Sequence, residues 1–313
     1  MNVRFMHWTV WWCAALAPVW LTAAACGGSS GTSAAAVGSP QATVTSAAGA
    51  TSDIGARMLP VAGMQTLVKA SAGSAGTKAA LTYQSKLSDP RLSGILTLKV
   101  AAVLRDDASG YFEGTAVVRN DAGTWRGTVQ GLVSAGGAEL TSRGIGFAAE
   151  KDATAPAGTA VSWAGAIESA DGGAVPAPTG TAQAPAGWTP VAGKTAFVSV
   201  GEVWWRFTDT SSDARVTGAV KADVHDDPPR ADRSTEWWSR YSLRNDGGRW
   251  TTGHMTGARG VGISEHFMAA SAEGSGGYAG LTYHVMNHFY EEPGGGLTPD
   301  TPVFVAGWIE AAD

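Results

Sequence analysis

Cysteine is nearly absent from this chain. Its 313 residues include two, Cys13 and Cys26, and both lie near the N-terminus. A disulfide framework, a thiolate metal site and a cysteine nucleophile are therefore excluded for the part of the chain that follows residue 26. Several catalytic signatures are missing as well: there is no Gly-x-Ser-x-Gly, no His-Glu-x-x-His, no phosphate-binding loop and no dinucleotide fingerprint.

Charge is also sparse and slightly negative. Asp, Glu, Lys and Arg make up 16% of the chain, and the net charge is −5. Acidic residues outnumber basic ones 16 to 10 from residue 194 onward, whereas the two are balanced at 11 each over residues 53–171. Since no basic run or patch is visible, we expect no nucleic-acid partner.

The N-terminus has the organisation of a secretory signal. Arg4 precedes an apolar stretch, Trp8–Leu21, that is too short for a comfortable membrane span. The stretch ends in Ala23-Ala24-Ala25-Cys26, followed by Gly and Ser. These residues resemble the bacterial lipoprotein signal, although Ala23 stands where that signal usually has Leu.

The lipoprotein resemblance implies a signal peptide over residues 1–25 and acylation (including palmitate) at Cys26. It also implies a cell-envelope protein, lipid-anchored in the cell membrane on the extracytoplasmic side. Two acyl signals of this kind hold a protein stably on a bilayer. The alternative is an ordinary cleaved signal in which Cys26 is incidental.

Two heptapeptides carry the same turn signal: Arg119–Trp125 reads RNDAGTW, and Arg244–Trp250 reads RNDGGRW. Asn, Asp and Gly tolerate the backbone of tight hairpins, so each predicts strand–turn–strand, with the Trp anchoring the returning strand in a core. Ser88–Gly94 likewise matches Ser212–Gly218, and a later segment of each copy repeats too. Landmarks that recur in one order predict a duplicated domain.

Short alternating runs punctuated by Gly, Asn and Asp predict an all-β fold of about seven or eight strands per repeat. We expect two tandem antiparallel β-barrels, since closure removes exposed edges, with a small sandwich as the open alternative. The predicted organisation is a flexible tether over 26–53, a first repeat over 54–171, a Pro/Ala/Gly-rich linker over 172–193 and a second repeat over 194–313.

The segment Gly274–Leu281, GSGGYAGL, places a Gly-rich turn before an aromatic residue. It resembles the late hairpin of the allene oxide cyclase and dirigent β-barrels, and the first repeat lacks the aromatic residue. The resemblance implies an eight-stranded barrel and admits isomerase or cyclase chemistry. The wider pattern is similar to bacterial secreted proteins of uncharacterised role, which implies no mechanism.

The second repeat differs from the first in its aromatic and imidazole content. It contains six Trp and five His, whereas the first contains two Trp and no His. The pairs Trp204-Trp205 and Trp237-Trp238 place one indole on each face of a strand. An inward indole fills a core, and an outward one is a candidate surface for an apolar ligand, a sugar or a partner.

Histidine and carboxylate neighbours offer weaker sites. His284 and His288 share a strand face and precede two glutamates, Glu291 and Glu292, but their Cβ atoms stand about 13 Å apart along a straight strand. We therefore expect no metal and no cofactor, and interpret these histidines as hydrogen-bonded to neighbours. His225, which precedes two aspartates and two prolines, is better interpreted as part of a solvated turn than as a base.

The leading hypothesis is a non-enzymatic binding role through the second repeat, with an apolar small molecule, a glycan or a protein as partner. The candidate ligand-binding residues are Trp204, Trp205, Trp237, Trp238, His284 and His288. The first alternative is an isomerase or cyclase, which requires a cavity in the second repeat and a histidine beside a carboxylate. The second alternative is a structural spacer.

Overall fold

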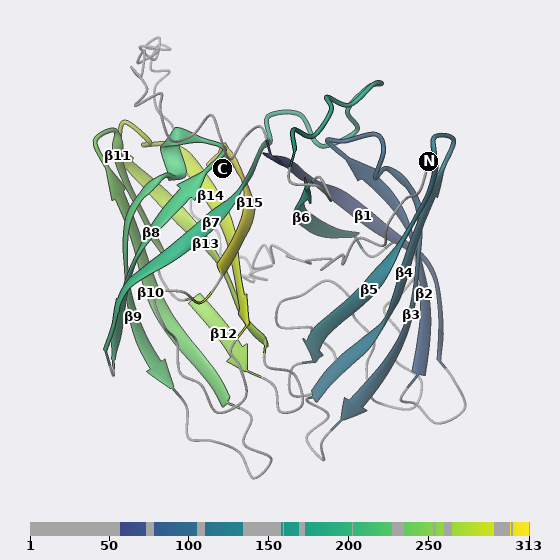
Figure 1. The fold of residues 1–313 in the computed structure, drawn as a ribbon, viewed down its shortest axis with the longest axis horizontal. Coiled ribbons are helices and arrows are strands. Elements are labelled where there is room, and N and C mark those ends of the chain that lie inside the picture. The colour runs from purple at the N-terminus through teal and green to yellow at the C-terminus, as the bar shows by residue number, and fades with distance from the viewer. Residues whose placement is uncertain are drawn as a thin grey trace, which may run out of the picture.

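The fold rests on a computed structural model that describes residues 57–72, 78–104, 110–133, 158, 160–168, 173–201, 203–226, 235–252, 255–259, 265–290, 301 and 303–312. All its long elements are β-strands, and they form two curled units that stand side by side (Figure 1). The prediction of an all-β protein with two barrel-like repeats is confirmed. Within the described part, no helix has the length and apolar character needed to cross a bilayer.

The first unit is a curled antiparallel sheet of six strands in the order β5-β4-β3-β2-β1-β6. Residues 134–157, where further strands of this repeat are predicted, lie outside the described residues. The strands are β1 (Met58–Ala72), β2 (Lys78–Leu87), β3 (Gly94–Leu104), β4 (Gly110–Asn120), β5 (Gly123–Val133) and β6 (Ala160–Glu168).

The second unit is a closed antiparallel barrel in the order β11-β10-β12-β13-β14-β15-β7-β8-β9, with β9 paired back to β10. Because β11 and β12 both pair with β10 and β13, they act as one interrupted strand and give an eight-stranded barrel. The elements are β7 (Thr189–Val200), β8 (Trp204–Ser211), the 3-10 turn η1 (Ala214–Val216), β9 (Gly218–Asp226), β10 (Thr235–Asn245), β11 (Gly248–Thr252), β12 (Met255–Arg259), β13 (Glu265–Gly276), β14 (Leu281–Tyr290) and β15 (Val303–Ala311).

Alternation along the strands decides which side chains enter each core. On β8, Phe207, Asp209 and Ser211 are buried, whereas Arg206 and Thr208 on either side of Phe207 are exposed. This period of two gives each strand one interior and one outer face. The core of the second barrel includes Phe197, Phe207, Val220, Tyr241, Leu243, Trp250, Tyr283 and Val285.

One end of the second barrel is held by the β10–β11 hairpin, which contains the repeated Asn-Asp turn. The Asn245 side-chain amide donates to the carbonyls of Ala214, Arg215 and Thr217, at 3.1, 3.1 and 2.9 Å. Trp250 Nε1 donates to the Arg215 carbonyl at 2.7 Å. The hairpin therefore satisfies the backbone of the η1 turn and secures it to the barrel.

The first repeat reproduces this arrangement. The Asn120 amide donates to the carbonyls of Pro90, Arg91 and Ser93 at 3.3, 2.7 and 2.8 Å, and Trp125 Nε1 donates to the Arg91 carbonyl at 2.8 Å. Since both copies use the motif in the same way, its role is to clamp a loop to a hairpin. The motif thus belongs to the fold rather than to a ligand site.

A second apolar layer joins the two repeats. Strands β1 and β6 contact β7 and β15. Ala62 is paired with Ala164 in the first sheet, as Ala192 is with Ala306 in the second, and all four are completely buried without belonging to either core. Equivalent strands of the two repeats therefore pack together through equivalent alanines.

Candidate functional site

The Trp204–Trp205 pair occupies both faces of β8. Trp205 packs on the barrel core, with its ring centroid 6.0 Å from that of Phe197. Trp204 lies on the outer face, where the Arg206 guanidinium sits 5.2 Å from its ring centroid. Its indole also packs against Gly201, at which even an added Cβ would meet the ring at 2.7 Å. Trp204 therefore supports Arg206 more than it offers a free ring to a ligand.

Three other candidates are placed by backbone alone. Trp237 pairs with Asp226 and Trp238 with His225, across β10 and β9. His288 lies on β14 between β13 and β15. The side chains of Trp237, Trp238 and His288 lie outside the described residues, so their use in binding stays a prediction.

His284 lies on the outer face of β14 and is well connected. Its Nε2 lies 2.6 Å from Glu310 Oε1, its Nδ1 lies 2.8 Å from Ser271 Oγ, and its ring stacks on Trp308 at 4.5 Å between centroids. Burial lowers the pKa of His284, while the hydrogen bond to Glu310 acts in the opposite direction. A histidine does meet a carboxylate, as the enzyme alternative requires, but on the outside of the barrel.

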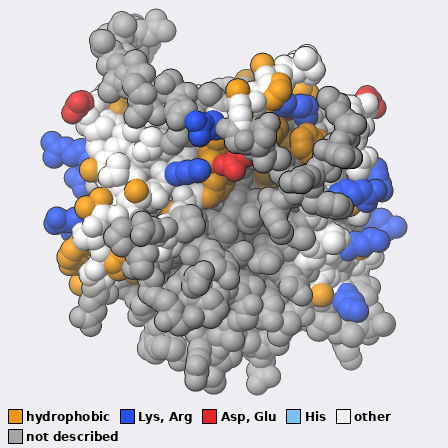
Figure 2. All heavy atoms as spheres, in the orientation of Figure 1, with side chains coloured by type: hydrophobic (Ala, Val, Ile, Leu, Met, Phe, Trp, Pro, Cys, Tyr) orange, Lys and Arg blue, Asp and Glu red, His pale blue; other side chains and the backbone are white. Residues whose placement is uncertain are grey.

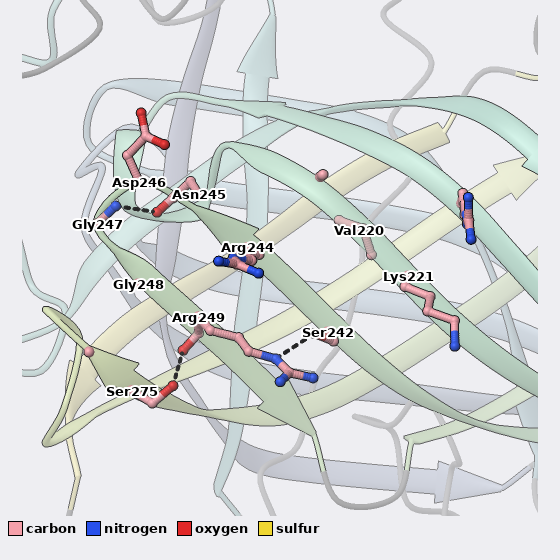
Figure 3. A pocket seen from close by; sticks show the side chains of 13 residues that line it. Val220, Lys221, Ser242, Arg244, Asn245, Asp246, Gly247, Gly248, Arg249 and Ser275 are labelled. Atoms are coloured by element: carbon pink, nitrogen blue, oxygen red, sulfur yellow. Dashed lines mark hydrogen bonds between the residues drawn. The ribbon is translucent and has the colours of Figure 1, made fainter.

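Trp204 and His284 are not brought together, because β15 and β7 separate β14 from β8 in the barrel. The residues that share a surface with Trp204 are instead basic. Arg206, on the same face of β8, lines a groove of about 830 Å³ on the outer face of the sheet formed by β8 to β11 (Figure 3). This volume is in the range of binding sites for small molecules.

Four cations line this groove, one from each of four neighbouring strands: Arg206, Lys221, Arg244 and Arg249. We call the groove that they line the cationic groove. Arg206 lies directly opposite Lys221, and Arg244 directly opposite Arg249. Like charges directly opposite each other destabilise a sheet, so the fold by itself gives no reason for this arrangement.

In the part of the chain that the structure describes, few contacts neutralise these charges. Lys221 pairs with Asp223 at 2.9 Å, and Arg249 Nε donates to Ser242 Oγ at 2.8 Å. Among the described residues, no carboxylate lies within ion-pairing distance of the guanidinium groups of Arg206, Arg244 or Arg249. All four cations are exposed. The groove can therefore present several charged donors to an anion at once.

The first repeat is an internal reference for this surface, because its strands pair in the same register. Thr82 lies opposite Thr97 where Arg206 lies opposite Lys221, and Arg119 lies opposite Thr124 where Arg244 lies opposite Arg249. The first repeat thus has threonine at three of the four positions that carry a cation in the second. The same strand register forms with threonine at three of these positions, so the pairing of the strands does not require the cations.

The sequence shows no basic run, and the absence of a nucleic-acid partner stays a prediction. The four cations are dispersed along the chain, and the barrel gathers them by placing their strands side by side. Basic side chains stand out on both flanks of the molecule in Figure 2, but the described groove belongs to the second repeat. The alignment of the two repeats did contain a signal for this groove, because three threonines of the first repeat align with three of its cations.

Among the described residues of the second barrel, one acidic side chain is buried in the interior. Asp209 is 1% exposed and accepts hydrogen bonds from Thr195 Oγ1 and, at 2.9 Å, from Tyr241 Oη. Burial raises the pKa of Asp209 to about 6, against the effect of these hydrogen bonds. Within the described part of the chain, no three metal-ligating side chains lie together. Asp209 is thus a carboxyl group buried in the barrel core, and its pKa lies above the usual value.

Comparison with protein-family models, with curated proteins and with solved structures found no match for this chain.

Proposed function

We propose that the protein is a non-enzymatic binding protein of the cell envelope, anchored at Cys26, whose second repeat binds an anionic ligand in the cationic groove. The N-terminal sequence supports the anchor and the extracytoplasmic location. The groove supports the ligand charge, because a protein of net charge −5 concentrates four exposed cations in it.

The observation that carries the proposal is the contrast between the repeats. Arg206, Lys221 and Arg249 replace threonines of the first repeat at positions of identical strand register. Guanidinium groups bind carboxylate, sulfate and phosphate through two parallel hydrogen bonds, which a threonine does not offer. At these positions the second repeat thus presents charged donors to the groove, whereas the exposed cations of the first repeat (Lys86, Lys99 and Arg126) stand at other positions of the equivalent face.

The test is a titration of the full chain, in non-ionic detergent, with inorganic tripolyphosphate. Binding is measured by calorimetry. The groove variant changes three cations to the residues of the first repeat: Arg206→Thr, Lys221→Thr and Arg249→Thr. Each charge-assisted hydrogen bond contributes about 1.5–3 kcal/mol, so the variant is expected to bind at least ~100-fold more weakly.

The matched control makes the same change of net charge in the first repeat: Lys86→Thr, Lys99→Thr and Arg126→Thr, all at exposed positions. This control should bind tripolyphosphate as tightly as the wild type does, because it changes the net charge and leaves the groove intact. Equal weakening in both variants would contradict a localised site. So would a wild-type protein that shows no binding at low salt, where ionic contacts are strongest.

A second candidate function rests on a separate observation, the Ser271–His284–Glu310 contacts. A serine, a histidine and a carboxylate joined in this order match the roles of nucleophile, base and orienting acid in acyl transfer. It ranks second because Ser271 is exposed on an open sheet face. Labelling by a fluorophosphonate that Ser271→Ala abolishes would support it, and an unlabelled wild-type protein would exclude it.

A further inference from the structure

We infer that the occupant of the cationic groove is a linear anionic polysaccharide, which lies across strands β8 to β11 with its acidic groups on the four cations. This inference rests on the proposed anion-binding function and adds the class of ligand to it.

The spacing of the cations indicates a ligand longer than a single anion. Arg206 and Lys221 are direct neighbours, as are Arg244 and Arg249, while Lys221 is paired with Ser242, two residues from Arg244. Three steps between adjacent strands span about 14 Å, which one phosphate or carboxylate does not cover. The groove volume of about 830 Å³ also exceeds what a single small anion fills. A chain that carries several acidic groups meets both conditions.

The remaining lining residues favour a ligand rich in hydroxyl groups. Ser242 and the Asn245–Gly248 turn lie beside the cations, and Ser275 and Gly276 of β13 border the groove next to β11; the turn also contributes one carboxylate, that of Asp246. Figure 3 shows Ser242 and Ser275 on either side of Arg249, with Ser242 Oγ accepting from its guanidinium and Ser275 Oγ donating to its carbonyl. These small polar groups leave room for sugar rings and supply hydrogen-bonding partners for their hydroxyls.

Other polyanions fit the lining less well. Among the described residues that line the groove there is no aromatic side chain, and single-stranded nucleic acids are held largely by stacking on such rings. The only large apolar residue in this described lining is Val220, which is buried. Peptide interfaces and membrane surfaces draw on exposed apolar side chains, which this lining therefore lacks.

The experiment titrates the full chain in non-ionic detergent with galacturonate and its dimer, tetramer and octamer. Fully methyl-esterified octamer, tripolyphosphate and a short DNA duplex are the comparison ligands. We expect the octamer to bind at least ~100-fold more tightly than the monomer, because it adds several charge-assisted contacts. The esterified octamer should not bind, and the groove variant should lose the gain with chain length.

The outcomes separate the two levels of the proposal. If tripolyphosphate binds but the octamer does not exceed the monomer, the polysaccharide inference fails and anion binding stands. If the DNA duplex binds more tightly than the octamer at the same salt concentration, the ligand class is wrong. If none of the acidic ligands binds, both the inference and the proposed function fail.

Discussion

The buried carboxyl group of Asp209 makes the second barrel sensitive to pH, and the change Asp209→Asn tests this. Asp209 is 1% exposed, and burial raises its pKa from 3.8 to about 6. Between these two values the folded chain holds a proton that the unfolded chain releases. The stabilisation by this proton is complete below pH 3.8 and is lost as the pH rises through about 6.

The magnitude follows from the shift of about two pH units, which corresponds to roughly 3 kcal/mol at about 1.4 kcal/mol per unit. The asparagine does not titrate and retains an oxygen that accepts from Tyr241. We therefore expect the free energy of unfolding of the wild type, relative to Asp209→Asn, to fall by about 3 kcal/mol between pH 4 and pH 7.5.

The assay is urea unfolding of both proteins at closely spaced pH values, because the difference between them cancels every other titration. Ser275→Ala, at an exposed position without a titratable side chain, is the control and should keep the wild-type pH dependence. The first repeat has Gln65 opposite Ser85 where the second has Thr195 opposite Asp209, so it has no carboxyl group at the position equivalent to Asp209. A pH profile that Asp209→Asn leaves unchanged would refute the reasoning.

Three further predictions concern the clamps and the outer face. Asn245→Ala should lower the free energy of unfolding by about 2–4 kcal/mol in denaturant titrations, because three carbonyls lose their donor; an effect no larger than that of an exposed Ser275→Ala would contradict the clamp. Gly247→Ala should cost about 1–3 kcal/mol, because its Cβ would overlap the Tyr278 hydroxyl, whereas Ala122→Gly in the first repeat should change stability little; calorimetric melting compares the two. Glu310→Gln should further lower the pKa of His284, measured by the NMR titration of its ring, because the carboxylate favours the charged imidazole; an unchanged or raised value would count against the contact.

Local sequence patterns predicted the fold well, because tight turns and the alternation of apolar and polar residues depend on residues that are close in the sequence. The two Asn-Asp hairpins and the division of Trp204 and Trp205 between the faces of β8 follow from such signals. The closing pair β9–β10 does not, since the register of distant strands depends on the whole barrel.

The candidate site was not predicted from the sequence for the same reason. Arg206, Lys221, Arg244 and Arg249 lie on separate strands, and only their lateral order makes them neighbours. Asp209 lies in the polar run from Thr208 to Thr210, which does not reveal that its side chain points inward.

The most direct test of the central claim is to map which arginines a bound anion protects. The full chain is treated with phenylglyoxal, which modifies accessible guanidinium groups, with and without tripolyphosphate, and modified sites are quantified by mass spectrometry. The account predicts protection of Arg206, Arg244 and Arg249, while Arg119 and Arg126 of the first repeat stay as reactive as before. Equal protection in both repeats, or protection of none of the three, would contradict it.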